Sequence, residues 1–440
     1  MQYKFSILLL SFLFPAFLSG QQFDDWLVEN AISLPLPQPT FELDNLDALG
    51  NSMGNAEVIA LGDATHGTRE FNQMKFHLVR FAVERLGIRL FILEEGFTHC
   101  LSVNQYLQTG IGTAEEALDR LSGWVWKTEQ MRNLVKWMRR WNVRHPGDPI
   151  AFYGMDMQSF KSPALLLVNY SVKYAPDLYK NHFELLDQIL SHPSDRLPPK
   201  LARSLADLTQ GLISDLRVGA YEMDRLGGTD RNQLQMAAIT LYQAIELNYA
   251  DRPSYRNHSL FLNVNSLRKM RGRKEKAILW THNAHITRTP AEDGVLSMGS
   301  YLAMKYGRSY FALGFDFGEG DFMTMDRPKG KPVTVSLNWQ TRKPNPYWSA
   351  LADQESPVTF MDLRRARQVP KVKRFLEKYS QVRCIGNTLS EKGSEDHFEG
   401  DSVTEKDQKT LLDRSPVHEN YDGIFWFTRT TPSRTMDQSP

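Results

Sequence analysis

ALGDATHGTREFNQMKFHLVRF, residues 60–81, changes character twice along its length. An apolar run stops at a glycine, a turn crowded with ionisable side chains follows, and an amphipathic pattern begins after it. Met74, Leu78 and Phe81 share one helix face, and Thr68 stands where a helix N-cap is expected. The segment therefore predicts a buried strand, a polar turn and a helix, which is the repeating unit of an α/β fold.

Similar apolar runs recur along the chain. They occupy residues 57–61, 89–93, 149–153, 277–280, 309–315 and 423–427. Most are apolar throughout rather than alternating, which favours strands that helices cover on both faces. Strands that alternate with helical patterns predict the α/β class, with a mostly parallel sheet flanked by helices.

The apolar pattern also divides the chain. Residues 161–271 show apolar spacings of three and four without a strand-like run, which predicts a helical insertion between two parts of an α/β core, 21–160 and 272–430. Residues 386–409 are polar and charged and predict a mobile surface loop. Residues 431–440 are expected to form a tail.

The first 20 residues have the pattern of a secretory signal peptide. Lys4 precedes an apolar run over residues 5–18, and small residues follow it. The run is too short for a comfortable membrane span, and an uncleaved anchor is the alternative. No other stretch approaches that length, so we expect a secreted or periplasmic protein without a stable membrane span.

Composition and cysteine content narrow the class further. The 440 residues include 52 Lys and Arg against 51 Asp and Glu, so net charge implies no nucleic-acid partner. Cys100 and Cys384 are the only cysteines. An oxidising compartment would permit a bridge between them, and the alternative is two independent small apolar residues.

Ionisable residues follow the predicted strands at their carboxyl ends, where ligands bind in open parallel sheets. They are Asp63, His66, Glu94, Glu95, Asp156, His282, His285, Asp316 and Glu319. Each alone would more often be a hydrogen-bonded structural residue, but their coincidence at one edge of the sheet indicates a functional site.

These residue types suit water activation. A neutral His66 can take a proton from water, and Glu94 or Asp63 can fix its tautomer, position the water or relay a proton. His285 or His282 can stabilise developing negative charge or protonate a leaving alkoxide. Attack on an ester carbonyl requires these roles, whereas no G-x-S-x-G motif follows a predicted strand to supply a serine nucleophile.

Two alternatives use the same residues differently. A divalent metal could be held by Asp63, His66, Glu94, His282 and His285, although HNAH is a weak metal motif and H-E-x-x-H is absent. A non-catalytic protein could use the histidines to hold haem or iron. The favoured hypothesis needs no resident cofactor.

An ordered set of motifs resembles the erythromycin esterase family. The chain contains VIALGDATHGTREF, then RLFILEEGF, then ILWTHNAHI, and finally YDGIFWFTRTTPSR. The resemblance implies a hydrolase of the erythromycin esterase type that acts on a small-molecule ester or lactone. Macrolide lactones, and hence macrolide resistance, are the family's association.

The resemblance also implies roles for single residues. His66 matches the family's proposed general base, and Glu94 matches its acidic residue at the second strand end. Arg69, Lys75 and Arg256 match positions that are expected to bind substrate, with a solvated charge as the alternative for Lys75.

One position departs from the family pattern. Asp63 stands where the family has glutamate, and its side chain is shorter by one methylene, about 1.5 Å of reach. The resemblance therefore supports the reaction class better than it supports macrolides as the substrate.

Overall fold

A computed structural model describes most of the chain between residues 21 and 436. The described residues are 21–219, 227–250, 252–272, 275–291, 294–326, 330–338, 345–385, 398–399, 402–403, 412–413 and 415–436. The predicted signal peptide and most of the predicted loop 386–409 lie outside them.

Two units divide the chain. The first contains residues up to 87, 128–131 and those from 280 onward, and the second contains 88–127 and 132–279. These limits differ from the predicted ones, because the strands between residues 88 and 160 pack with the helices of 161–271 rather than apart from them.

The first unit is built on a mixed sheet. Its strand order is β1-β8-β13-β6-β2, and β7 also pairs with β6. The bounds are β1 Ile32–Leu34, β2 Val58–Leu61, β6 Tyr310–Asp326, β7 Lys331–Asn338, β8 Val358–Asp362 and β13 Gly423–Thr430. The pairs β2–β6 and β6–β13 are parallel, whereas β8–β13, β1–β8 and β6–β7 are antiparallel.

Helices and short strands complete the first unit. Residues 21–30 are helical. The other helices are η1 Leu43–Leu46, α2 Asp47–Met53, α3 Arg69–Glu84, α12 Asn283–Ile286, α13 Met298–Tyr306, η4 Gly307–Ser309, α14 Pro346–Ala352, α15 Leu363–Ala366, α16 Pro370–Tyr379 and α18 Val417–Asn420. The short strands are β9 Val382–Arg383, β10 Phe398–Glu399, β11 Ser402–Val403 and β12 Leu412–Asp413.

The second unit combines strands with a group of helices. Its strand order is β5-β3-β4, and β3 and β4 are parallel. The bounds are β3 Leu90–Gly96, α4 Phe97–Thr109, α5 Ala114–Asp119, η2 Trp124–Trp126, α6 Glu129–Arg144, β4 Ala151–Asp156, α7 Lys161–Tyr174, α8 Pro176–Ser191, α9 Pro199–Val218, α10 Gly227–Glu246, α11 Arg252–Arg271 and β5 Ala277–Trp280. The first turn of α6 and the last residue of β5 belong to the first unit.

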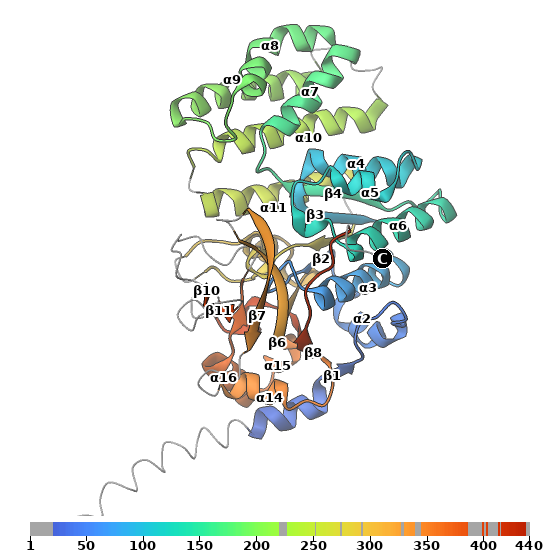
Figure 1. Cartoon of the computed structure of the whole chain (residues 1–440), viewed down its shortest axis with the longest axis vertical. Coiled ribbons are helices and arrows are strands. Elements are labelled where there is room, and N and C mark those ends of the chain that lie inside the picture. The colour runs from blue at the N-terminus through green and yellow to red at the C-terminus, as the bar shows by residue number, and fades with distance from the viewer. Residues whose placement is uncertain are drawn as a thin grey trace, which may run out of the picture. The chain divides into compact units, whose positions relative to one another are not determined.

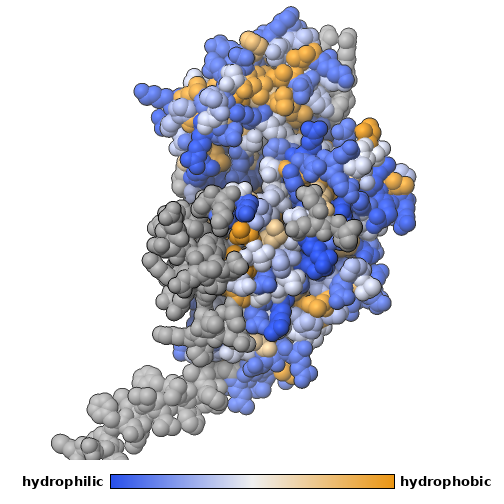
Figure 2. Space-filling view, in the orientation of Figure 1, coloured by the Kyte–Doolittle hydropathy of each residue, from blue (hydrophilic) through white to orange (hydrophobic). Residues whose placement is uncertain are grey.

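The helices α7 to α10 gather into one bundle (Figure 1). Leucine and alanine side chains from all four form a continuous buried core, including Leu167, Leu186, Leu205 and Leu241. Hydrophobic side chains also reach the bundle's surface (Figure 2). Among the described residues, none of the helices is long and apolar enough for a membrane crossing.

The predicted α/β class is confirmed, and each of the six predicted strands is present. The strands β2, β4 and β5 are buried along their whole length, as expected for strands covered on both faces. The antiparallel strands β1, β7 and β8 were not predicted, and β6 continues eleven residues beyond its predicted end at Phe315, as one side of the long β6–β7 ribbon (Figure 1).

The close approach of β3 and β4 gives a test of the second unit. A Cβ at Gly154 would lie 2.3 Å from the carbonyl oxygen of Glu95. We predict that Gly154→Ala lowers the free energy of unfolding by about 1–3 kcal/mol, because backbone must move to admit the methyl group. Urea denaturation measures the change. Gly147→Ala, where nothing lies within 4 Å of the added Cβ, is the matched control. Equal stability of the two variants would contradict this packing.

Candidate active site

The polar turn after β2 is fixed by backbone hydrogen bonds from distant segments. Thr281 N donates to the carbonyl of Leu61 at 2.9 Å, and Asn283 N donates to that of Asp63 at 2.8 Å. Ile385 N donates to the carbonyl of Ala64 at 2.7 Å. The turn is therefore held by the segment after β5 and by the segment after β9.

The end of the turn is held by two further segments. Met323 N and Ser433 N both donate to the carbonyl of Gly67, at 3.0 and 2.9 Å. Gly67 lies so close to β6 that a Cβ would stand 1.9 Å from the carbonyl oxygen of Met323, which explains the glycine in the motif. Ser433 falls in the predicted tail 431–440. The described part of that segment instead packs against the turn, since Asn72 also bonds Ser433.

Three ionisable side chains meet here, two from the turn and one from α3. Nδ1 of His66 lies 3.2 Å from Oδ1 of Asp63, and the other carboxylate oxygen accepts a hydrogen bond from Nζ of Lys75. Asp63 and Lys75 are 1% and 0% exposed, and His66 is 8% exposed. The arrangement is a buried ion pair with an imidazole nitrogen beside its carboxylate.

Charge compensation keeps the Asp63 carboxylate ionised. Burial by itself would raise the pKa of Asp63, but the charges of His66 and Lys75 bring that pKa below its usual value. Lys75 also donates to the carbonyl of Thr281 at 3.3 Å, and its ammonium lies 5.0 Å from the ring centre of Trp280. These contacts hold the ammonium in place beside the carboxylate.

Lys75 is buried, whereas the sequence predicted a substrate-binding or solvated lysine. It lies four residues after Phe71 and three before Leu78, both of which are buried, so the helical period places it on the inner face of α3. That spacing was the signal available in the sequence. Lys75 positions Asp63 and has no exposed surface with which to bind substrate.

His282 packs beside His66 and is anchored at both ring nitrogens. The ring centroids of the two histidines lie 5.2 Å apart. Nδ1 of His282 accepts from Ala284 N at 3.2 Å, and its Nε2 lies 3.3 Å from the carbonyl of Ala64. This pair of contacts fits a neutral ring with the proton on Nε2. His282 is thus suited to holding the turn, and less suited to the predicted role of acid.

Two further predicted site residues of this unit, His285 and Arg69, have surroundings that differ from those of His282. His285 is half-buried in α12, next to the anchored His282. Arg69 begins α3 and lines a pocket of about 380 Å³ together with Met323 and residues 431–434. Nε of Arg69 is buried and has no hydrogen-bond partner among the described residues, and the substrate-binding role of Arg69 stays a prediction.

Sequence reasoning missed Asn283, which joins the turn to β6. Its side-chain amide donates to the carbonyl of Phe315 at 2.8 Å and accepts from Phe315 N at 3.2 Å. The signal was its place between the two histidines of HNAH. Asn283 thus copies a strand-pairing contact with its side chain and places the segment after β5.

A second cluster lies in the second unit. Nη2 of Arg256 donates to Glu94 at 2.8 Å and to Asp156 at 2.6 Å. Burial raises and the charge of Arg256 lowers the pKa of Asp156, with a lowered pKa as the net result. Arg256 therefore contacts carboxylates in this structure, where the sequence predicted a substrate contact. Asn263 supports the same strand end by donating to the carbonyl of Met155 at 2.8 Å.

Glu95, the neighbour of Glu94, has a structural role. Its carboxylate accepts from Ser122 N and Gly123 N, each at 3.0 Å, and from Gly96 N at 2.6 Å. Burial opposes ionisation, but these bonds and His99 lower the pKa of Glu95. The two adjacent glutamates of the motif therefore differ: Glu95 is held by backbone amides, whereas Glu94 accepts from Arg256.

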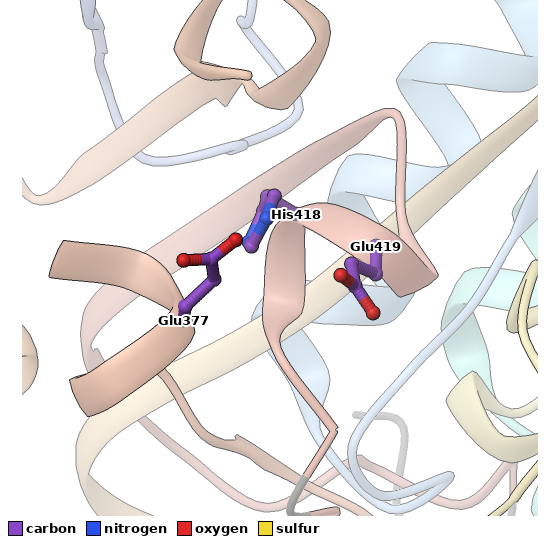
Figure 3. Close-up of side chains that lie close together, drawn as sticks. All are labelled: Glu377, His418 and Glu419. Carbon is purple, nitrogen blue, oxygen red and sulfur yellow. The ribbon is translucent and has the colours of Figure 1, made fainter. Parts of the chain in front are cut away.

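Side chains that could hold a metal converge elsewhere in the first unit. Among the described residues, Glu377, His418 and Glu419 (Figure 3) offer ligand atoms within 4.8 Å of one another. No such group of three is found around Asp63 among the described residues. Glu377 reaches toward His418 from α16 (Figure 3) and also pairs with Lys373 at 3.4 Å. A metal at His66 thus has no preformed set of three protein ligands among these residues.

The fold and site define an α/β protein with an aspartate–histidine pair beyond a strand end. Residues 83–430 match the family model for erythromycin esterase. The chain belongs to the erythromycin esterase family, as its motifs predicted, and this membership supports hydrolase activity.

Two curated relatives cover most of the chain. Erythromycin esterase type II of Escherichia coli is 26% identical over 368 residues, which span 74% of this chain and 84% of the relative. The putative hydrolase YbfO of Bacillus subtilis (strain 168) is 23% identical over 450 residues, which span 93% of this chain and 91% of the relative.

Solved structures share the fold. A crystal structure of a Bacillus cereus protein has a TM-score of 0.79 at 21% identity, covering 94% of this chain and 99% of its own. A succinoglycan biosynthesis protein has a TM-score of 0.76 at 20% identity, with coverage of 94% and 98%. A histidine-to-asparagine mutant of the erythromycin esterase EreC, in its open conformation, has a TM-score of 0.64 at 17% identity, with coverage of 91% and 98%.

The buried ion pair gives a test of the site's architecture. We predict that Lys75→Met lowers the free energy of unfolding by about 3–5 kcal/mol, because the Asp63 carboxylate loses its buried counter-charge. Chemical denaturation measures the loss, and Lys371→Met at an exposed position of α16 is the control. In a double-mutant cycle, Asp63→Asn recovers part of the loss. Additive effects of the two substitutions would contradict the pairing.

The lowered pKa of Asp63 sets a pH dependence. The pKa of Asp63 in the folded protein lies below its usual value of 3.8, so the pair contributes stability above about pH 4 and loses it as the pH falls further. We expect Asp63→Asn to lose less stability than the parent between neutral pH and about pH 3. Urea denaturation at the two pH values measures the loss of stability in each protein. An equal loss in both would refute the lowered pKa of Asp63.

Proposed function

We propose that the protein is an exported hydrolase that cleaves a small-molecule ester or lactone with water activated by His66. The observation that carries the proposal is the contact between Nδ1 of His66 and the buried carboxylate of Asp63. A carboxylate in this position favours the tautomer with its proton on Nδ1, so that Nε2, on the other side of the ring, can accept a proton.

The chemistry follows in two steps. His66 takes a proton from water as the oxygen attacks the ester carbonyl, and the positive charge that forms on the imidazole faces the Asp63 carboxylate. The tetrahedral intermediate then collapses when the alkoxide leaves and takes a proton back from the imidazolium. The ammonium of Lys75 contacts the other carboxylate oxygen and thereby favours the ionised form of Asp63.

The shorter aspartate is compatible with this role. Asp63 reaches His66 across three residues of one turn, and the carbonyl of Asp63 is held by Asn283 N. A glutamate would displace the imidazole or the lysine by about one bond length. We propose that Asp63 adjusts the site to a substrate other than the family's macrolides.

Substitution of the dyad tests the mechanism. We predict that His66→Ala lowers kcat for a true substrate by about 10²- to 10⁴-fold while the melting temperature changes little, because general base catalysis is lost. Asp63→Asn lowers kcat with less effect on KM, since it misorients the base. A macrolide panel and a panel of acylated sugars supply the candidate substrates for the assay.

Three outcomes would contradict the proposal. Full activity of His66→Ala would show that His66 is not the general base. Loss of activity in chelator, restored by a divalent ion, would favour the metal-dependent alternative. A stoichiometric Soret-absorbing cofactor without hydrolysis would favour a haem protein. Export is checked separately by the N-terminal mass of the protein recovered outside the cytoplasm, which should begin near Gln21.

A further inference from the structure

A pocket rich in arginine lies at the edge of the first unit's sheet opposite the His66 turn. Arg308 precedes β6 and Asp422 precedes β13, so both stand at the amino ends of these parallel strands. Asp63 follows the carboxyl end of β2, which is parallel to β6. The pocket is therefore separate from the site described above.

The lining of this pocket carries excess positive charge. Of the described residues that line its volume of about 480 Å³, five are arginines and two are aspartates, an excess of three positive charges. The arginines are Arg288, Arg308, Arg364, Arg365 and Arg367, and the aspartates are Asp362 and Asp422.

The two carboxylates are already engaged within the protein. Asp422 accepts from Arg288 at 2.7 Å and from the backbone amide of Ala312 at 3.0 Å. Asp362 accepts from the Ser52 hydroxyl at 2.6 Å and from the backbone amide of Arg364 at 3.0 Å. Among the described residues, neither carboxylate is hydrogen-bonded to the guanidinium of Arg308 or Arg365.

Three of the arginines are fixed by backbone carbonyls. Arg288 donates to the carbonyl of Tyr310 at 3.0 Å, and Arg367 donates to that of Tyr421 at 2.6 Å. Arg364 donates to the carbonyl of Ser52. Burial, together with the neighbouring charges of Arg288 and Arg364, lowers the pKa of Arg367 in spite of Asp422. The inner wall is thus a rigid array of crowded guanidinium groups.

The remaining two arginines are exposed at the rim. Neither the Arg308 nor the Arg365 guanidinium has an ion-pair or hydrogen-bond partner among the residues that the structure describes. Guanidinium groups bind phosphate through paired N–H donors, and a fixed array loses little entropy when it does so.

We propose that this pocket binds a compact anion that carries a phosphate group, taken from solution. A phosphate monoester has a charge of about −1.5 to −2 near pH 7, which an excess of three positive charges can hold. The volume of about 480 Å³ exceeds the space of a single phosphate and leaves room for a small organic group.

Calorimetric titration of the full-length mature protein tests the proposal, with inorganic phosphate and pyrophosphate as probes at constant ionic strength. We expect saturable binding that is tighter for pyrophosphate. Arg308→Gln and Arg365→Gln should each weaken it by about tenfold, and the double variant by more, because each removes a charge-assisted hydrogen bond. Arg140→Gln, at an exposed arginine of α6, is the matched control and should bind like the parent.

Circular dichroism of each variant without phosphate confirms that it is folded, so weakened binding can be assigned to the pocket. Absence of saturable binding to the parent protein would overturn the proposal, as would equal affinity in the parent and the double variant. Binding to phosphatidic acid vesicles but to neither free anion would overturn it in favour of a membrane surface. None of these measurements depends on hydrolase activity.

Discussion

A buried positive charge dictates the geometry around the first polar turn. An ammonium group with 0% exposure must have a counter-charge, and Lys75 finds it in Asp63. The carboxylate then has one oxygen left, which faces His66. The orientation of the imidazole is therefore a consequence of how α3 packs against the sheet, because the helix brings the lysine to the place where the aspartate must be.

The backbone supports this arrangement from four distant parts of the chain. Segments near residues 281–283, 323, 385 and 433 each donate a hydrogen bond to the turn between Leu61 and Gly67. A turn with so many fixed carbonyls cannot relax when a proton moves. That rigidity is what a general base requires, since its position must stay constant while its charge changes.

The sequence predicted the parallel strands well and the antiparallel strands poorly. Strands such as β2 and β5 are buried on both faces, so their apolar runs are unambiguous. The β7 strand alternates polar and apolar residues, KPVTVSLN, and the antiparallel strands β1 (ISL) and β8 (VTFMD) lack a long apolar run. Periodicity could also have placed Lys75 on the buried face of α3, but a lysine at such a position is expected to be solvated.

Contacts between residues that are far apart in the chain could not be predicted from the sequence. Arg256 contacts Glu94 across 162 residues, and composition gives no sign of that choice of partner. The roles of Glu94 and Glu95, adjacent in the motif, differ because only the second faces the amides of Ser122 and Gly123. Local patterns thus indicated which strand ends carry ionisable groups, and tertiary contacts decided what each group does.

The position of the proton on the His66 ring shows whether Asp63 orients the imidazole. Nitrogen NMR of protein labelled at histidine, with the His66 signals assigned by loss in His66→Ala, reports which ring nitrogen carries the proton. We predict a neutral ring protonated on Nδ1 in the parent protein, changing to the Nε2 form or a mixture in Asp63→Asn. A proton on Nε2 in the parent protein, unchanged by that substitution, would show that Asp63 does not orient the base.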